Sequence, residues 1–257
     1  EENTLILTAV VNRFGGMVVG PTSLPHDGET FAQQLAASLM RWQAEQHKAV
    51  WLEIPIEQPH LIPHAVAANL ELHHAEASFL MLTYMLQPNA FIPPYATHYA
   101  GAGGVVINHQ NELLVIVEKG HVQKRPNFYK LPGGALELGE HIADGVRREV
   151  LEETGIETTF HSLVCFRHWH RYRFGKSDFY FVCRLTPTSA AITLEDEEIA
   201  KCEWMPIDTY LDHPDVAMFN KRIVRAALHQ KGLQLEQLDG YNPVEREFFF
   251  IDAVETT

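Results

Sequence analysis

The alternation of apolar and polar positions divides the chain into two segments of mixed α/β character. In the first segment, apolar runs predict strands over residues 5–11, 49–54 and 78–86. Four apolar residues at helical spacing predict a first helix: Phe31, Leu35, Leu39 and Trp42. A second helix is expected near 65–72. This order of strand, helix, strand, helix and strand predicts a small α/β domain.

The second segment surrounds one well-marked helix. That helix should run from about His141 to Thr154 and end at Gly155, because glycine readily takes the left-handed conformation that ends helices. A final helix is expected over 218–231, and apolar runs predict strands over 104–107, 113–118, 179–184 and 202–205. The first two strands should form a hairpin around Asn108 to Asn111. Together these elements predict an α/β/α sandwich.

A proline- and glycine-rich stretch separates the two segments. It runs from Pro93 to His98 and is followed by Gly101, Gly103 and Gly104, a composition typical of a linker. We therefore expect an N-terminal domain over residues 1–97 and a larger C-terminal domain over 98–257.

Composition narrows the classes of partner and compartment. The 257 residues carry a net charge of -13, which disfavours binding to a nucleic acid polymer or to an anionic membrane. The sequence has three widely spaced cysteines, a first stretch without a basic signal region, and no apolar run near the roughly 18 residues of a membrane span. We expect a cytoplasmic protein that binds a small molecule, with a cation between the acidic chain and any phosphate ligand.

Three carboxylates on one helix face indicate where that cation binds. Glu149, Glu152 and Glu153 follow the i, i+3, i+4 spacing, which places them on the same side of a helix. Like charges in this arrangement repel one another. A hard divalent ion such as Mg²⁺ or Mn²⁺ would neutralise them through oxygen ligands.

Four neighbouring residues fit the same site, although each has an alternative. Glu140 stands at the expected helix start, where it could instead act only as a cap. Arg148 could orient a carboxylate, or form a surface ion pair. Gly133 and Gly134 would let the backbone approach a metal or phosphate, or form an ordinary turn.

This stretch resembles the Nudix signature, G-x5-E-x7-R-E-U-x-E-E-x-G-U with U a bulky apolar residue. All nine constrained positions match: Gly134, Glu140, Arg148, Glu149, Val150, Glu152, Glu153, Gly155 and Ile156. The resemblance implies a Nudix α/β/α sandwich with a loop, helix and loop that bind Mg²⁺ or Mn²⁺. It also implies hydrolysis of a pyrophosphate bond in a nucleoside diphosphate derivative.

Site roles follow from the same resemblance. The carboxylates of Glu149, Glu152 and Glu153, with the carbonyl of Gly133, are expected to bind the metal, and Glu140 to support the site. The general base stays open between Glu152, Glu153 and a carboxylate outside the signature. Glu198 matches the acidic position that follows the signature in the family, with Asp196 and Glu197 as further candidates.

The N-terminal segment resembles the pre-Nudix domain of plant and animal proteins, which is related to acetyltransferase folds. The matching stretches are Trp51–Pro55, His73–Glu76 and Leu80–Tyr84. Acyl transfer is not expected, because the Q/R-x-x-G-x-G/A loop that cradles coenzyme A is absent from residues 1–97. Several plant members hydrolyse ADP-ribose and NADH, so these are the first substrates to expect.

Other features leave alternatives open. Tyr172 stands where ADP-ribose hydrolases often have proline and is more reminiscent of diadenosine polyphosphate hydrolases. The basic stretch from Arg167 to Lys176 could meet substrate phosphates or be a solvated charge run. His73 and His74, expected on a helix, should have a structural or interface role. A homodimer is expected. A nucleotide-binding sensor on the same fold is the alternative to an enzyme, and a scaffold in which the N-terminal domain chiefly builds the dimer is a third hypothesis that can coexist with catalysis.

Overall fold

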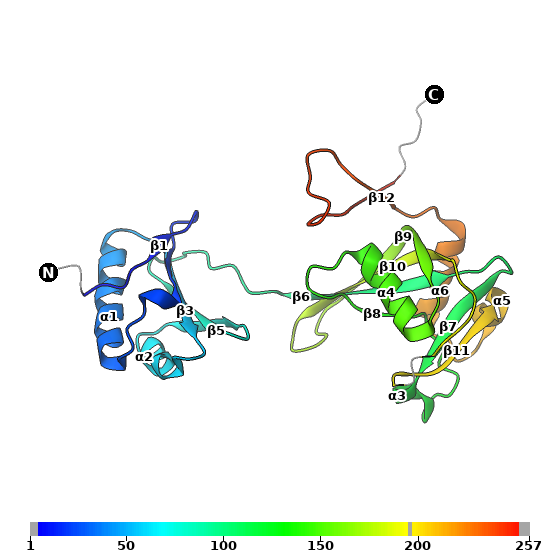
Figure 1. Cartoon of the computed structure of the whole chain (residues 1–257), viewed down its shortest axis with the longest axis horizontal. Coiled ribbons are helices and arrows are strands. Elements are labelled where there is room, and N and C mark those ends of the chain that lie inside the picture. The colour runs from blue at the N-terminus through cyan, green and yellow to red at the C-terminus, as the bar shows by residue number, and fades with distance from the viewer. Residues whose placement is uncertain (1–4, 195–196, 252–257) are drawn as a thin grey trace. The chain divides into compact units, whose positions relative to one another are not determined.

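The computed structural model describes residues 5–194 and 197–251, and the chain divides into two compact units, Glu1–Ala96 and Thr97–Thr257 (Figure 1). Each unit has its own hydrophobic core. One cluster of buried side chains is drawn from the first unit, between Leu7 and Leu86. Two further clusters are drawn from the second unit. The expected α/β character is present in both units.

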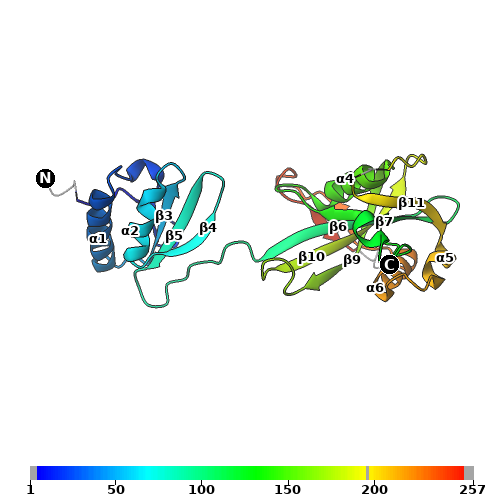
Figure 2. The ribbon, with the colours of Figure 1, turned by 90° about the horizontal axis from the view of Figure 1, so that it is seen from below.

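The first unit is a five-stranded sheet with two helices against one face. Its strands lie in the order β1 (Val10–Val11), β2 (Met17–Val19), β3 (Ala49–Pro55), β5 (Phe79–Met85) and β4 (Glu71–Ala75). Helices α1 (Gly28–Ala44) and α2 (Ile62–Ala67) lie on the same face of the sheet (Figure 2). Short 3-10 turns lie at Pro21–Ser23 and Pro59–Leu61. Phe31 and Leu35 of α1 are buried with Leu52 of β3, as the helical spacing predicted.

Two expected elements of this unit are wrong. Strand structure over 5–11 is limited to Val10–Val11, because the Leu7 N–H donates instead to Ser38 Oγ of α1 at 2.9 Å. The helix expected near 65–72 ends at Ala67, since Asn69 adopts a left-handed φ of 63° and β4 then pairs with β5.

The two adjacent histidines therefore lie on a strand rather than on a helix. A register shift between Leu72 and His74 interrupts the pairing of β4 with β5. As a result the Nδ1 atoms of His73 and His74 lie 2.7 Å apart, and His73 Nε2 donates to the Pro93 carbonyl at 2.7 Å. These contacts tie residue 93 to the edge of the sheet.

The second unit contains a four-stranded sheet in the order β8 (Gly133–Ala135), β6 (His98–Val106), β10 (Ser177–Pro187) and β9 (Thr158–Trp169). Strands β6 and β10 are parallel, and the other pairs are antiparallel. Two smaller sheets pair β7 (Glu112–Glu118) with β11 (Ile199–Pro206), and β12 (Gln234–Glu236) with β13 (Phe248–Phe250). The helices are α3 (Lys119–Val122), α4 (Ile142–Thr154), α5 (Ile207–Asp212) and α6 (Met218–His229).

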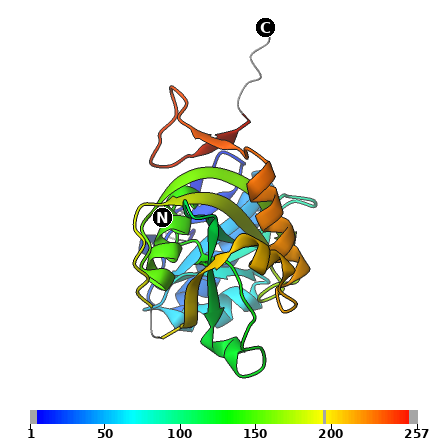
Figure 3. The same ribbon diagram turned by 90° about the vertical axis from the view of Figure 1, so that its right-hand side faces the viewer.

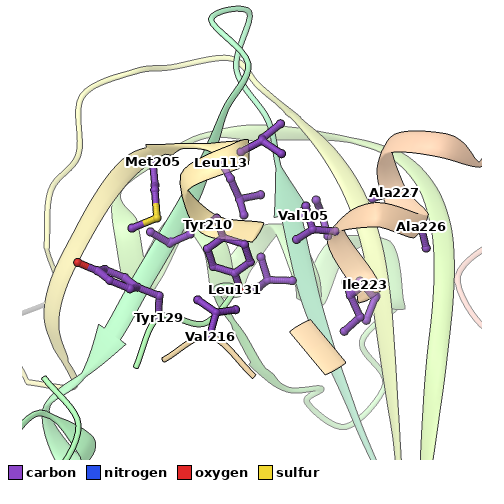
Figure 4. Packing of buried hydrophobic residues seen from close by; sticks show 14 of the residues in the cluster. Val105, Leu113, Tyr129, Leu131, Met205, Tyr210, Val216, Ile223, Ala226 and Ala227 are labelled. Carbon is purple, nitrogen blue, oxygen red and sulfur yellow. The ribbon is translucent and has the colours of Figure 1, made fainter. Parts of the chain in front are cut away.

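Helices α4 and α6 lie on opposite sides of the strands (Figure 3). Val146 and Val150 of α4 are fully buried in one cluster, while Val105, Tyr210 of α5 and Ile223 of α6 belong to the cluster on the other side (Figure 4). The expected α/β/α sandwich is confirmed by this layering. Within the described residues, no helix is both long enough and apolar enough to cross a membrane.

The expected hairpin is present only as a turn. Asn111 has a φ of 62°, and the Asn108 side chain accepts from the Gln110 and Glu112 N–H groups. Beyond the bridge between Ile107 and Leu113, however, β6 and β7 belong to different sheets. Both edges of β6 are used by β8 and β10, so β7 pairs with β11 instead.

Candidate active site

Strand β8 lies so close to strand β6 on one side and to helix α4 on the other that it requires glycine at two positions. A Cβ on Gly133, whose φ is 145°, would lie 2.3 Å from the Ala102 carbonyl oxygen. A Cβ on Gly134 would lie 2.5 Å from Glu149 Oε2. The helix keeps its predicted end, with Gly155 in the left-handed conformation at φ 70°. Gly134 thus brings the backbone of β8 against the carboxylate of Glu149, and Gly133 allows the close contact of β8 with β6.

Arg148 gathers three carboxylates around one guanidinium. Its Nε and Nη2 donate to Glu140 at 2.7 and 2.9 Å, which is a bidentate contact. Its Nη1 donates to Glu149 at 3.0 Å and to Glu152 at 2.9 Å. The hydrogen bonds from Arg148 hold the pKa of Glu140 below its ordinary value. The sequence predicted that these four residues lie together, and the structure places them so.

Glu153 is the buried carboxylate of the helix and has no contact with Arg148 among the described residues. The residue is 6% exposed, and its carboxylate accepts a hydrogen bond from the Gly133 N–H at 2.7 Å. Burial raises the pKa of Glu153 to about 7, although the positive charge of Lys130 opposes this shift. Burial also raises the pKa of Glu149. The buried carboxylate of Glu153 and the partly buried carboxylate of Glu149 therefore lack enough nearby positive charge to stay at their ordinary pKa.

The donor set fits a hard divalent cation. Within the described part of the chain, no group of three or more His, Cys, Asp or Glu side chains is already arranged as a metal site. The carboxylates of Glu149 and Glu152 instead contact the guanidinium of Arg148. All the candidate ligands are oxygens, which Mg²⁺ and Mn²⁺ prefer. A bound cation would also relieve the burial cost seen at Glu149 and Glu153.

A cleft of about 380 Å³ opens beside strand β8, which carries Gly133 and Gly134. It combines aromatic rings, cations and acids, which suits a ligand with a base and phosphates. The lining includes Tyr99, Glu118, Phe128, Lys130, Gly133, Gly134, Arg167, Tyr172, Arg173, Asp178, Tyr180 and Phe219. Sequence analysis missed Glu118, Lys130 and Asp178, which form ion pairs across the cleft wall.

Arg167 is a partly buried cation of this cleft, paired with an acid and flanked by aromatic rings. Its Nη2 donates at 2.7 Å to Asp178, which is 5% exposed. Its guanidinium lies 5.1 Å from the Trp169 ring centroid and 5.2 Å from that of Tyr180. The buried Nε of Arg167 has no hydrogen-bond partner among the described residues. Such a group is available to an acceptor on a bound ligand.

The basic stretch is split between two faces of the sheet. Strand β9 continues to Trp169, so Arg167 lies on the strand, and Arg173 and Tyr172 reach the cleft from the loop that follows. His168 instead stacks on His98, with their Nε2 atoms 3.0 Å apart. The stretch therefore fits the phosphate-contacting alternative only in part.

Glu198 lies in the exposed turn that precedes β11. Its carbonyl accepts a hydrogen bond from the Lys119 N–H at 2.9 Å, beside the end of β7. Among the described contacts, none joins its carboxylate to the glutamates of α4. Glu197 is exposed beside it, and Asp196 lies outside the described residues.

Comparison with known proteins places both units in one family. The Nudix hydrolase domain model matches residues 7–86, and the NUDIX domain model matches residues 97–227. The chain belongs to the Nudix hydrolase family. It is thus an enzyme of that family, and the expected N-terminal α/β domain and C-terminal Nudix fold are confirmed.

Individual relatives extend this Nudix assignment over most of the chain. Nudix hydrolase 2 of Arabidopsis thaliana is 38% identical over 84% of this chain and 78% of its own length. Nucleoside diphosphate-linked moiety X motif 6 of Mus musculus is 34% identical over 97% of this chain and 80% of its own length. Nudix hydrolase 8 of Arabidopsis thaliana is 39% identical over 81% of this chain, which spans 57% of that relative.

Proposed function

We propose that this Nudix enzyme hydrolyses the pyrophosphate bond of a nucleoside diphosphate derivative with Mg²⁺ or Mn²⁺, and that ADP-ribose and NADH are its first candidate substrates. The observation that carries the proposal is the gathering of Glu140, Glu149 and Glu152 around Arg148. Glu149 of this cluster lies against Gly134 of strand β8, and Gly134 also lines the cleft.

The metal would be held by the carboxylates of Glu149, Glu152 and Glu153 with the carbonyl of Gly133. A bound divalent ion supplies charge neutralisation and a more acidic water at the phosphate. Arg148 orients the carboxylates of Glu149 and Glu152, and Glu140 holds Arg148 in place. The proton of the attacking water would go to Glu152 or Glu153, with Glu198 as the alternative base outside the signature.

The cleft supports the substrate class through its charges and rings. Arg167 and Arg173 offer cations to phosphates, and Tyr172 and Tyr99 offer ring faces to a base. The name of the mouse relative, nucleoside diphosphate-linked moiety X motif 6, agrees with this class. Because Tyr99 and Tyr172 each offer a ring face at the cleft, diadenosine polyphosphates belong in the same test.

The test is a hydrolysis screen of the purified full chain with Mg²⁺ or Mn²⁺. The panel contains ADP-ribose, NADH, NAD, coenzyme A, diadenosine polyphosphates, nucleotide sugars and nucleoside triphosphates, and the products are resolved by chromatography. E153Q should lose the activity, whereas E157Q removes an exposed carboxylate just beyond the helix and should retain it. Nucleotide binding without any hydrolysis would overturn the proposal and favour a sensor.

We further propose that the full chain is a homodimer in the cytoplasm. Its three cysteines are free, with Cys183 buried, which suits a reducing compartment. Light scattering of the full chain at micromolar concentration should give twice the monomer mass of 29.2 kDa. A monomer at all concentrations would contradict the dimer.

A further inference from the structure

Helix α4 has no local side-chain cap, although it contributes the signature glutamates. The residue at its N-cap, His141, makes no capping hydrogen bond. The first N–H groups of a helix have no partner within the helix and need one from elsewhere. Here Glu247 provides it from more than 100 residues away. Its Oε1 accepts from the Ile142 N–H at 2.5 Å, and its Oε2 lies 3.5 Å from the Ala143 N.

The C-terminal segment that carries Glu247 also contacts His141, the residue before the helix. His141 Nε2 lies 2.8 Å from the Pro243 carbonyl oxygen, and because a carbonyl only accepts, the ring nitrogen is the donor. Two strands, β12 and β13, frame this segment. We call residues 233–250 the C-terminal clamp.

The C-terminal clamp is itself fixed to the sheet of the second unit. Leu233 forms a two-way backbone bridge with Leu163 of β9, at 2.9 and 2.8 Å. The ring of Phe249 lies 5.8 Å from that of Phe160, and both rings pack against the core cluster beneath α4. The carboxylate of Glu247 on this framework therefore defines where the first turn of α4 lies relative to β9.

A short chain of contacts connects this first turn to the carboxylate cluster. Glu140 directly precedes His141, and its side chain accepts from the Glu137 N–H at 2.9 Å. Glu140 also holds Arg148 in the bidentate contact, and Arg148 in turn holds Glu149 and Glu152. A shift of the first turn would displace Glu140 and loosen the arginine that orients two proposed metal ligands.

We propose that Glu247 is a positioning residue for the metal site, and that the C-terminal clamp sets the affinity of helix α4 for its divalent ion. This inference rests on the proposed function for the identity of the metal ligands. The clamp lies beyond residues 97–227, the segment that the NUDIX domain model matches, so the domain model does not include it. A negative carboxylate also complements the positive end of the helix.

The experiment compares full-length wild type, E247A, E247Q and E245A. Glu245 is the matched control, because it is an exposed carboxylate on the same clamp without a side-chain hydrogen bond or ion pair among the described residues. Mn²⁺ affinity is measured by electron paramagnetic resonance without substrate. Hydrogen exchange of peptides covering 140–146 is measured in the same samples. Thermal unfolding confirms that each variant is folded.

We expect E247A to weaken Mn²⁺ binding by about threefold or more and to speed exchange in the first turn of α4, since caps and supporting contacts act on this scale. E247Q should be intermediate, because its amide oxygen accepts without charge, and E245A should match wild type. Equal Mn²⁺ affinity in E247A and E245A would overturn the role of the clamp, even if hydrogen exchange is faster in E247A, and would leave the proposed metal site standing. If wild type itself binds no Mn²⁺, the proposed metal site fails and this inference fails with it.

Discussion

Glu153 is a carboxylate held in an environment that favours its protonated form. It is 6% exposed and accepts one hydrogen bond from Gly133, and burial raises its pKa from 4.5 to about 7. A group whose pKa is raised by folding stabilises the fold below the unfolded value of 4.5. That contribution disappears as the pH rises through the folded value near 7.

Metal-free protein should therefore lose stability between about pH 4.5 and pH 7. We expect the melting temperature of wild type in a chelator to fall over this range, and the fall to be smaller in E153Q, whose amide does not titrate. Mg²⁺ added at pH 8 should raise the melting temperature of wild type but not of E153Q. Parallel curves for the two proteins would show that Glu153 has an ordinary pKa.

The bridging geometry of Arg148 makes lysine a poor replacement. A single ammonium cannot keep the bidentate contact with Glu140 while it also contacts Glu149 and Glu152. We expect R148K to lower kcat/KM by about tenfold or more. The matched control is R147K, since Arg147 is the adjacent arginine and donates to the Thr158 carbonyl. Equal losses in both variants would argue against a special role for Arg148.

Among individual residues, the sequence predicted the site residues that are close together in the chain and missed those that are far apart in it. Glu140, Arg148 and the three helix glutamates follow one fixed spacing within a single stretch of the chain. Asp178 and Glu247 have no such pattern, because only the pairing of β9 with β10 and the folding back of the C-terminal clamp bring them to the site. An isolated acidic residue in sequence gives no sign of such a partner.

The end of helix α4 is fixed by a residue that alanine cannot imitate. Gly155 has a φ of 70°, and a Cβ there would lie 2.8 Å from Thr193 Cβ and 2.9 Å from its backbone N. Gly240 has a similar φ of 84° but no atom within 4 Å of the same position. The pair separates backbone strain from steric contact.

We expect G240A to lower the free energy of unfolding by about 1–2 kcal/mol, the cost of a left-handed L-residue. G155A should cost more, because the Cβ must also displace Thr193. Urea unfolding followed by circular dichroism measures both values. Equal losses would mean that the segment around Thr193 moves aside freely.

Element boundaries were predicted best where the signals lie within the element. Helix α4 starts one residue later than expected and ends where its glycine indicated. Strand β4 was mistaken for the end of a helix, and β6 was paired with the wrong neighbour. In both cases the outcome depends on which edge of β5, β8 or β10 is free, and local propensity does not contain that information.

At the scale of the molecule, the core clusters do not cross residue 97. The first cluster ends at Leu86, and the other two begin at Ala102 and Val105. A unit with its own buried core should fold alone. The linker composition predicted a domain boundary after residue 97. Expression of each part by itself tests this prediction.

Residues 98–257 should unfold in one cooperative transition and retain metal-dependent hydrolysis. If the N-terminal unit builds the proposed dimer, this fragment should be monomeric in light scattering while the full chain is dimeric. An insoluble fragment, or one without a cooperative transition, would contradict the boundary. A fragment that remains dimeric would exclude the N-terminal unit as the source of the dimer.

Strand β6 also gives the connection between the units a mechanical character. It begins at His98, the second residue of the second unit, and is an inner strand with nine consecutive residues in parallel register with β10. Tension transmitted through residues 87–97 would act along β6, so that many hydrogen bonds share the load in shear. Optical tweezers attached to the chain ends should therefore record rupture of the second unit at high force; rupture at low force in small steps would show that the strand peels away instead.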